Sequence, residues 1–159
     1  MRNMPRRNIS EKAISVWRIR GAIDSCLYLL LLVGLFFIFS WYDIPMYYLY
    51  ISSGVVILAG IWEIILLPHI RWKIWRYEVF EKEVELLRGI FIVKHTLIPM
   101  SRVQHVDTEQ GPIYKKYGLT AVMISTAAGA HEIPALTEEV GTELRDQIAE
   151  LAGTDENDD

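Results

Sequence analysis

Two long apolar runs constrain this chain more than any other feature. Residues 22–41 contain Asp24 as their only charged side chain, and residues 46–67 contain only Glu63. A hydrocarbon core about 30 Å thick requires roughly 20 residues of α-helix, and a helix satisfies its own backbone hydrogen bonds in lipid. The connector, residues 42–45, is too short to hold a domain. The sequence therefore predicts an antiparallel transmembrane helical hairpin over residues 22–67.

The distribution of basic residues predicts the orientation of this hairpin. The connector has none, and the flanks carry Arg2, Arg6, Arg7, Lys12, Arg18 and Arg20 before the first run and Arg71, Lys73 and Arg76 after the second. Because positive charge stays inside, we expect a multi-pass cell-membrane protein with both termini in the cytoplasm. The first run exceeds the h-region of about 7–15 residues that a signal peptide carries, so an uncleaved anchor is favoured.

A cytoplasmic leader, residues 1–21, is expected before the hairpin. Residues 1–8 show no pattern, and Ser10 is placed to cap a short amphipathic helix. We expect this helix to lie along the membrane surface and to turn into the bilayer at Gly21.

Beyond Pro68 the pattern changes to short runs of β-branched and aromatic residues separated by turn signals. The predicted strands cover residues 71–80, 84–88, 90–98, 103–109, 119–126 and 131–133, the last stopping at Pro134. An amphipathic helix follows, with Thr137 as its N-cap and Val140, Leu144, Ile148 and Leu151 at helical spacing. The expected soluble part is thus one mainly-β antiparallel domain, residues 71–152, closed by a C-terminal helix and followed by an acidic tail, residues 153–159.

Composition argues against several classes of function. The net charge of −4 and the acidic tail disfavour nucleic-acid binding. Cys26 is the single cysteine, so no disulfide framework or thiol metal site is expected. The four histidines lack the spacing of a zinc site, and His105 and Asp107 on one strand face are predicted to make a structural hydrogen bond. Phosphate-binding glycine loops and nucleophile elbows are also missing. The sequence predicts a non-enzyme with no catalytic residue, no metal and no cofactor.

Asp24 and Glu63 fall at a similar depth, near the cytoplasmic end of each run. A carboxylate in the membrane is a functional hypothesis because charge in hydrocarbon is unfavourable. Near the boundary, however, a carboxylate can also reach water or pair with Arg20 or Arg71. Structural ion pairing and a transport or sensing role both remain open.

An ordered series of short motifs carries a family resemblance. They are Trp75-Arg76-Tyr77-Glu78, Gly89-Ile90-Phe91, Ile98-Pro99-Met100, Arg102-Val103-Gln104-His105-Val106-Asp107-Thr108, Gln110-Gly111-Pro112-Ile113, Lys116-Tyr117-Gly118-Leu119 and Ile133-Pro134-Ala135-Leu136. Together with the two-helix anchor they resemble the second bacterial pleckstrin-homology (PH) family, in its YdbS-like membrane proteins. The resemblance implies a PH-like antiparallel sandwich or partial barrel closed by a helix, on the cytoplasmic side. It also implies a larger multi-PH-domain membrane protein as partner, or self-association.

Lipid contact is expected at a different place from that of eukaryotic PH domains. Those domains often bind phosphoinositides through basic residues of their first hairpin loop, which here would be Glu81-Lys82-Glu83 and would repel phosphate. The remaining basic candidates are Lys115 and Lys116, either in a solvated loop or in contact with anionic headgroups. Tyr114 beside them is a candidate partner contact, with packing in the domain's own core as the alternative.

Two functional hypotheses follow. The first is a membrane-anchored, non-enzymatic interaction or scaffold protein at the inner face of the cell membrane, part of a complex in envelope maintenance or stress, with a partner strand added to an exposed sheet edge. The second is a subunit of a transport or efflux assembly in which Asp24 and Glu63 face a shared pathway.

Overall fold

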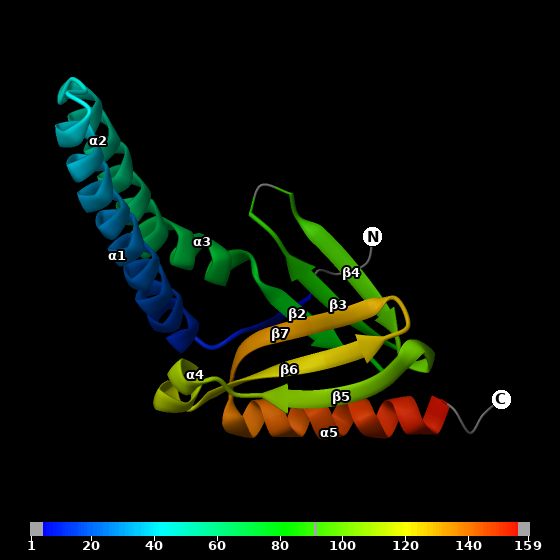
Figure 1. Cartoon of the computed structure of the whole chain (residues 1–159). Helices are drawn as coiled ribbons and strands as arrows, with labels where there is room; N and C mark the ends of the chain where they lie inside the picture. Colours follow the sequence, from blue (N-terminus) through cyan, green and yellow to red (C-terminus); the bar gives the residue numbers. More distant parts are fainter. Residues whose placement is uncertain (1–4, 91, 156–159) are drawn as a thin grey trace. The chain divides into compact units, whose positions relative to one another are not determined.

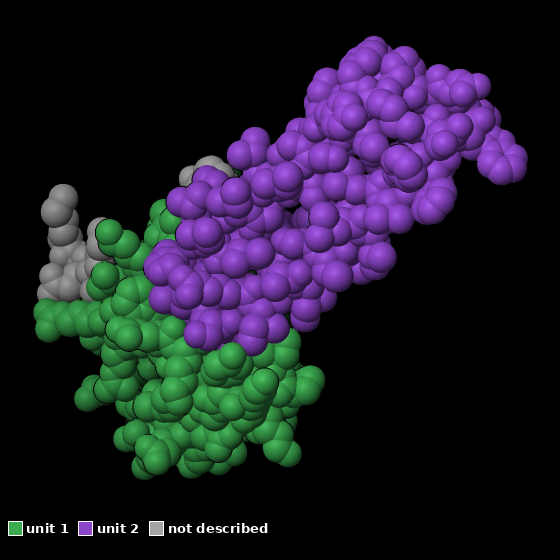
Figure 2. All heavy atoms as spheres, turned by 90° about the vertical axis from the view of Figure 1, so that its left-hand side faces the viewer, with its two compact units in different colours: residues 1–13, 70–159 green, residues 14–69 purple. Residues whose placement is uncertain are grey.

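A computed structural model describes residues 5–90 and 92–155 of the chain. It divides the chain into a helical unit, residues 14–69, and a mainly-β unit formed by residues 1–13 and 70–159 (Figure 2). Each unit has its own internal packing, and each is described separately below.

Two long helices make up the helical unit. The first is α1 (Lys12–Trp41), and the second runs continuously through α2 (Tyr47–Ile61), the π-helical segment η1 (Trp62–Leu66) and α3 (Leu67–Ile74) (Figure 1). Both helices are long and apolar enough to cross a membrane. Their leucine, isoleucine and phenylalanine side chains are largely exposed, as expected for a surface that meets lipid rather than water.

The expected turn at Gly21 is absent, because α1 continues through this residue. Gly21 is instead a point of close approach between the two helices: a Cβ atom there would lie 3.0 Å from the carbonyl oxygen of Glu63. Gly60 is similar, since its Cβ would lie 3.1 Å from Ser25 Oγ. Small residues at such points let helix backbones pack closely in the absence of a hydrophobic driving force.

The mainly-β unit contains two antiparallel sheets. Sheet A has the order β1-β2-β3-β4 and sheet B the order β5-β6-β7. The strands are β1 (Arg7–Asn8), β2 (Arg76–Val79), β3 (Glu83–Arg88), β4 (Lys94–Pro99), β5 (Val103–Glu109), β6 (Leu119–Thr126) and β7 (Gly129–Thr137). The short helix η2 (Met100–Arg102) joins the sheets, α4 (Pro112–Tyr117) joins β5 to β6, and α5 (Glu138–Asp155) follows β7. Within the described residues the sheets do not close into a barrel, and the predicted mainly-β class with a C-terminal helix is confirmed.

The core of this unit lies between the sheets and α5. Its buried apolar side chains come from β3, β6 and β7 and from one face of α5; they include Val84, Leu86, Leu119, Val122, Ile124, Ile133, Leu144 and Ile148. Helix α5 packs along sheet B, beside β5 (Figure 1). Thr137 caps α5 as predicted, since its Oγ1 accepts a hydrogen bond from the Val140 N–H at 3.4 Å.

Several boundaries differ from the sequence-based expectation. The strand expected over residues 90–98 begins only at Lys94, where β4 starts. Residues 71–74 continue the second helix, so β2 begins only at Arg76. Strand β7 passes through Pro134 to Thr137, which is possible because β7 is an edge strand with a register shift, where proline is tolerated. Strand β1, in the leader expected to be patternless, pairs with Arg76 and Tyr77. A strand of two residues is too short to show the alternation of apolar and polar side chains by which strands are predicted. The acidic tail is helical up to Asp155, and its last residues lie outside the described part.

Gly141 provides a test of the packing of α5 on sheet B. A Cβ at this position would lie within 2.2 Å of the Thr120 methyl carbon, and Thr120 is buried with its hydroxyl donating to the Glu109 carbonyl. Gly141→Ala should therefore lower the free energy of unfolding by about 1–3 kcal/mol despite the better helix propensity of alanine. Gly153→Ala, in the same helix with no atom near the added methyl, is the control and should be neutral or stabilising. Denaturant unfolding of the purified chain measures both; equal effects would contradict the close contact.

Candidate functional sites

A polar cluster joins the two helices of the helical unit. The hydroxyl of Tyr28 in α1 donates a hydrogen bond to Glu63 Oε1 in η1 at 3.3 Å. Asp24 lies one helical turn before Tyr28 on the same helix face. The other carboxylate oxygen of Glu63, Oε2, is buried without a hydrogen-bond partner in the part of the chain that the structure describes. Within residues 5–90, no ion pair links Arg20 to either acid.

The π-helical segment that carries Glu63 has an identifiable cause. Pro68 lacks a backbone N–H and its ring would clash with the carbonyl one turn earlier in a regular α-helix. The helix widens just before it, so that the N–H of Leu67 bonds to the Trp62 carbonyl, five residues back. Such segments often mark functional sites. Sequence reasoning identified Asp24 and Glu63 but missed Tyr28, whose only signal was its place one turn after Asp24.

The residues around α4 adopt a short helix rather than the expected loop. Pro112 occupies the first turn and Gly118 ends the helix in the left-handed conformation, with φ 61°. Lys115 and Lys116 are exposed in the last turn, where lysine also stabilises the negative end of the helix dipole. Tyr114 is half-buried. This geometry is compatible with lipid or partner contact, and equally with a purely structural role.

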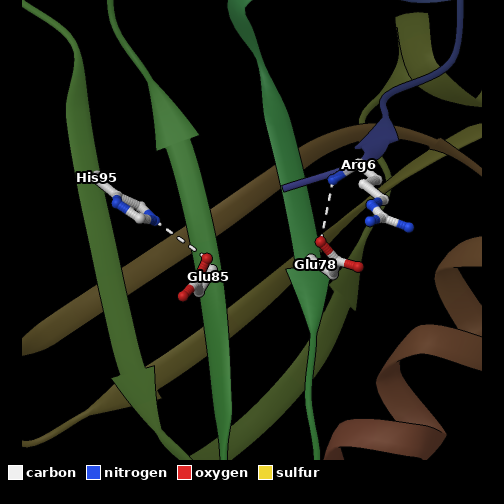
Figure 3. A network of polar contacts seen from close by, with 4 residues as sticks. All are labelled: Arg6, Glu78, Glu85 and His95. Carbon is white, nitrogen blue, oxygen red and sulfur yellow. Dashed lines mark hydrogen bonds and ion pairs between the residues drawn. The ribbon is translucent and has the colours of Figure 1, made fainter. Parts of the chain in front are cut away.

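A second polar network lies on one face of sheet A (Figure 3). His95 Nε2 of β4 and Glu85 Oε2 of β3 lie 3.2 Å apart, and Glu78 of β2 accepts a hydrogen bond from the Arg6 N–H at 3.2 Å. Glu78 and Glu85 are directly opposite each other in the strand register. Glu85 is only 1 % exposed, a burial that sequence reasoning missed because alternation predicts a solvated side chain there. One contact links the leader to β2, and the other links β3 to β4.

His105 on β5 makes a polar contact of its own. His105 Nε2 and Asp107 Oδ2 lie 3.3 Å apart, as the shared strand face predicted, but both side chains are well exposed, so water and salt weaken the pair. Among the described residues, no group of three or more histidine, cysteine, aspartate or glutamate side chains is arranged to hold a metal ion.

His131 lines a pocket of about 390 Å³ on the mainly-β unit. Leu97, Ser101, Arg102, Gln104 and Thr126 are among the residues that share this pocket. Burial and the nearby positive charge of Arg88 both lower the pKa of His131 from its usual value. Its Nδ1 atom is buried and has no hydrogen-bond partner within the described ranges. Both effects disfavour the protonated imidazole.

A shallow depression lies beside the β2–β3 turn. Its lining includes Glu81, Lys82, Glu83 and Glu85, with Gln147 and Leu151 of α5 on the other side. Glu81 and Glu83 flank Lys82 at the mouth of this depression, and the nearly buried Glu85 lies at its side.

Comparison with known proteins agrees with this architecture. Residues 26–152 match the family model described as Bacterial PH domain. The chain belongs to the bacterial PH-domain family. It is 41 % identical over 158 residues to the UPF0699 transmembrane protein YdbS of Bacillus subtilis (strain 168), covering 99 % of each chain. It is also similar to the UPF0699 transmembrane protein YdbT of the same organism, at 27 % identity over 81 residues, which is 51 % of this chain and 16 % of that protein.

No solved structure matches the chain. The relatives named transmembrane proteins and the two apolar helices together identify this bacterial PH-domain protein as a membrane protein. The family resemblance drawn from the ordered motifs is confirmed.

The lowered pKa of His131 predicts a specific pH dependence of stability. In the unfolded chain histidine titrates near its ordinary pKa of about 6.5, whereas the folded state resists protonation. The unfolded state therefore binds more protons in mild acid, and the free energy of unfolding falls as the pH drops through the unfolded-state pKa.

The loss of stability between about pH 7.5 and pH 5.5 should be smaller in His131→Gln than in the wild type, because the substitution removes this group. Arg88→Gln removes only the nearby positive charge and leaves the burial of His131 unchanged. Its loss of stability should therefore lie between that of the wild type and that of His131→Gln. Thermal unfolding at several pH values measures all three proteins. A wild-type pH dependence in His131→Gln would contradict the assignment.

Proposed function

We propose that this bacterial PH-domain protein is a membrane-anchored, non-enzymatic interaction module. The two apolar helices cross the cell membrane as a hairpin with both termini in the cytoplasm, as the basic flanks favour. The mainly-β unit then holds a partner protein at the inner face. The observation that carries this proposal is the edge of β5, which has no strand partner on one side among the described residues, although α5 packs beside this strand.

Strand β5 has a strand partner on one side only, since β6 is its neighbour and the described residues place no strand on its other side. Most of its side chains are exposed. Edge strands are usually protected by lysine, proline or a covering segment. Two other edge strands have such features. Strand β4 begins with Lys94 and ends with Pro99, and in β7 the Ala135 carbonyl accepts a hydrogen bond from the Ser10 N–H. Strand β5 contains neither lysine nor proline, so it is the edge best suited to receive a partner strand.

The partner favoured is a larger membrane protein with PH-like domains, or a second copy of this chain. Similarity to part of the much longer YdbT supports the first choice by analogy. Asp107 and Glu109 on β5 favour a partner strand with basic side chains. Lys115, Lys116 and Tyr114 on α4 would add contacts to the partner or to anionic headgroups. We place the complex in envelope maintenance or stress.

Photo-crosslinking in native membranes tests the proposed edge. A benzophenone amino acid at Thr108, an exposed position of β5, should give an adduct with a membrane protein that has a PH-like domain, or with a second copy. The same probe at Glu139, an exposed position of α5, is the control and should give no such adduct. Equal adducts at both positions, or none at Thr108, would contradict pairing at β5.

The buried Oε2 of Glu63 favours a second candidate function, a subunit of a transport or efflux assembly. Two helices do not enclose a pathway, so this function requires oligomers. Glu63, held by Tyr28 within a π-helical segment, would then carry a proton or cation together with Asp24.

Proton flux in reconstituted vesicles separates the two candidates. If the acids form a pathway, the double variant Asp24→Asn/Glu63→Gln should reduce the flux to that of protein-free vesicles, because both titrating groups are lost. Asp43→Asn, in the connector between the helices, is the matched control. An unchanged flux in the double variant would remove the transport candidate and leave the interaction module.

A further inference from the structure

The turn between β3 and β4 presents apolar side chains to solvent. Ile92 is 74 % exposed and Val93 is 56 % exposed, more than any other large apolar side chain described in the mainly-β unit. Single exposed apolar residues are ordinary on a protein surface, but two neighbours at the tip of a hairpin form a small contiguous patch. Phe91 lies outside the described residues and is left out of the argument.

The base of this turn carries two positive charges side by side. Arg88 and Lys94 are direct cross-strand partners, the last pair of the β3–β4 ladder before the turn. Like charges directly opposite each other destabilise a sheet, and in the described residues neither side chain has a carboxylate partner. The positive potential extends to β7, where Arg88 contributes to lowering the pKa of His131. An anionic surface above the tip would offset this repulsion.

Gly89 lies where the chain leaves β3 for the tip. Its φ of +112° is a conformation that favours glycine, and a Cβ there would lie 2.0 Å from the Ile92 carbonyl oxygen. The backbone at Gly89 therefore passes close to the backbone of Ile92, which leaves no room for a side chain at position 89.

The chain itself keeps this unit at a membrane surface. Helix α3 ends at Ile74 and β2 begins at Arg76, so a single residue connects the apolar helix to the sheet. A tether of this length gives the tip a high effective concentration at the bilayer, so a patch too small to bind a membrane alone becomes sufficient. An apolar tip between basic side chains is the arrangement that suits an interface with anionic lipids.

We infer that the β3–β4 turn is a membrane-inserting tip. Ile92 and Val93 enter the acyl region of the leaflet, and Arg88 and Lys94 contact anionic headgroups. The inference does not depend on a protein partner at β5. It gives the mainly-β unit a second attachment to the bilayer in addition to its connection to the helices.

The depth of position 92 in a bilayer tests this inference. The full chain is labelled with an environment-sensitive fluorophore at Ile92→Cys in a Cys26→Ser background and reconstituted in vesicles of phosphatidylcholine and phosphatidylglycerol. The control is Ala128→Cys, an exposed position in the β6–β7 turn without large apolar neighbours. Quenching by lipids that carry a nitroxide on the acyl chain should be several-fold stronger at 92 than at 128, and quenching by aqueous iodide several-fold weaker.

Two outcomes would overturn the inference. Equal lipid quenching at positions 92 and 128 would show that the tip stays in water. Protection of position 92 from iodide without lipid quenching would show that protein, such as a second copy, covers the tip.

Charge neutralisation tests the basic pair. Arg88→Gln/Lys94→Gln should bring the lipid quenching at position 92 close to the value measured in vesicles without phosphatidylglycerol, because the anionic headgroups no longer hold the tip. Unchanged quenching would refute the role of the pair. Since these measurements use the purified chain alone, they are decided independently of the crosslinks at β5.

Discussion

The exclusion of apolar helices from water is the constraint on which the rest of this protein depends. Helices α1 and α2 expose leucine, isoleucine and phenylalanine along most of their length, a surface that only lipid accommodates. In lipid, apolar surface no longer holds the two helices together, so their association has to come from close packing and polar contacts. Gly21, Gly60 and the Tyr28–Glu63 hydrogen bond supply both. The polar cluster is therefore a structural necessity first, whatever further role its carboxylate has.

The parts of the structure that the sequence predicted are those with strong periodicity. The apolar runs, the strands from β3 to β6 and the amphipathic face of α5 repeat often enough for burial to be read from the pattern. The features that were missed depend on contacts between distant segments. Strand β1 is too short to show a period, and Glu85 follows the alternation of a solvated residue although it is buried. In the sequence Gly21 suggests a break in the helix. Only the position of the partner helix shows that Gly21 is a point of close contact between the two helices.

The candidate site residues follow the same division. Asp24 and Glu63 stood out because a charge is conspicuous in an apolar run, while Tyr28 did not, since tyrosine is common in membrane helices. Lys115 and Lys116 were identified by charge, but their placement on a helix depends on the Pro112 and Gly118 caps acting together. The sequence predicted that Ile92 lies inside a strand, whereas it lies in the exposed turn beyond the last β3–β4 pair. A run of apolar residues looks the same in the sequence whether the side chains face a core or solvent.

Confinement to a membrane changes how strong each contact of the mainly-β unit has to be. The exposed side chains of β5 are mostly polar, so strand pairing there would gain little from apolar burial and would be weak between proteins free in solution. Two proteins anchored in one bilayer meet in two dimensions and with restricted orientations, which raises their effective concentration. A tip that limits rotation of the unit at the surface would add to this effect. A weak, polar edge is then adequate for a specific complex, and the same polarity prevents aggregation of the unpaired chain.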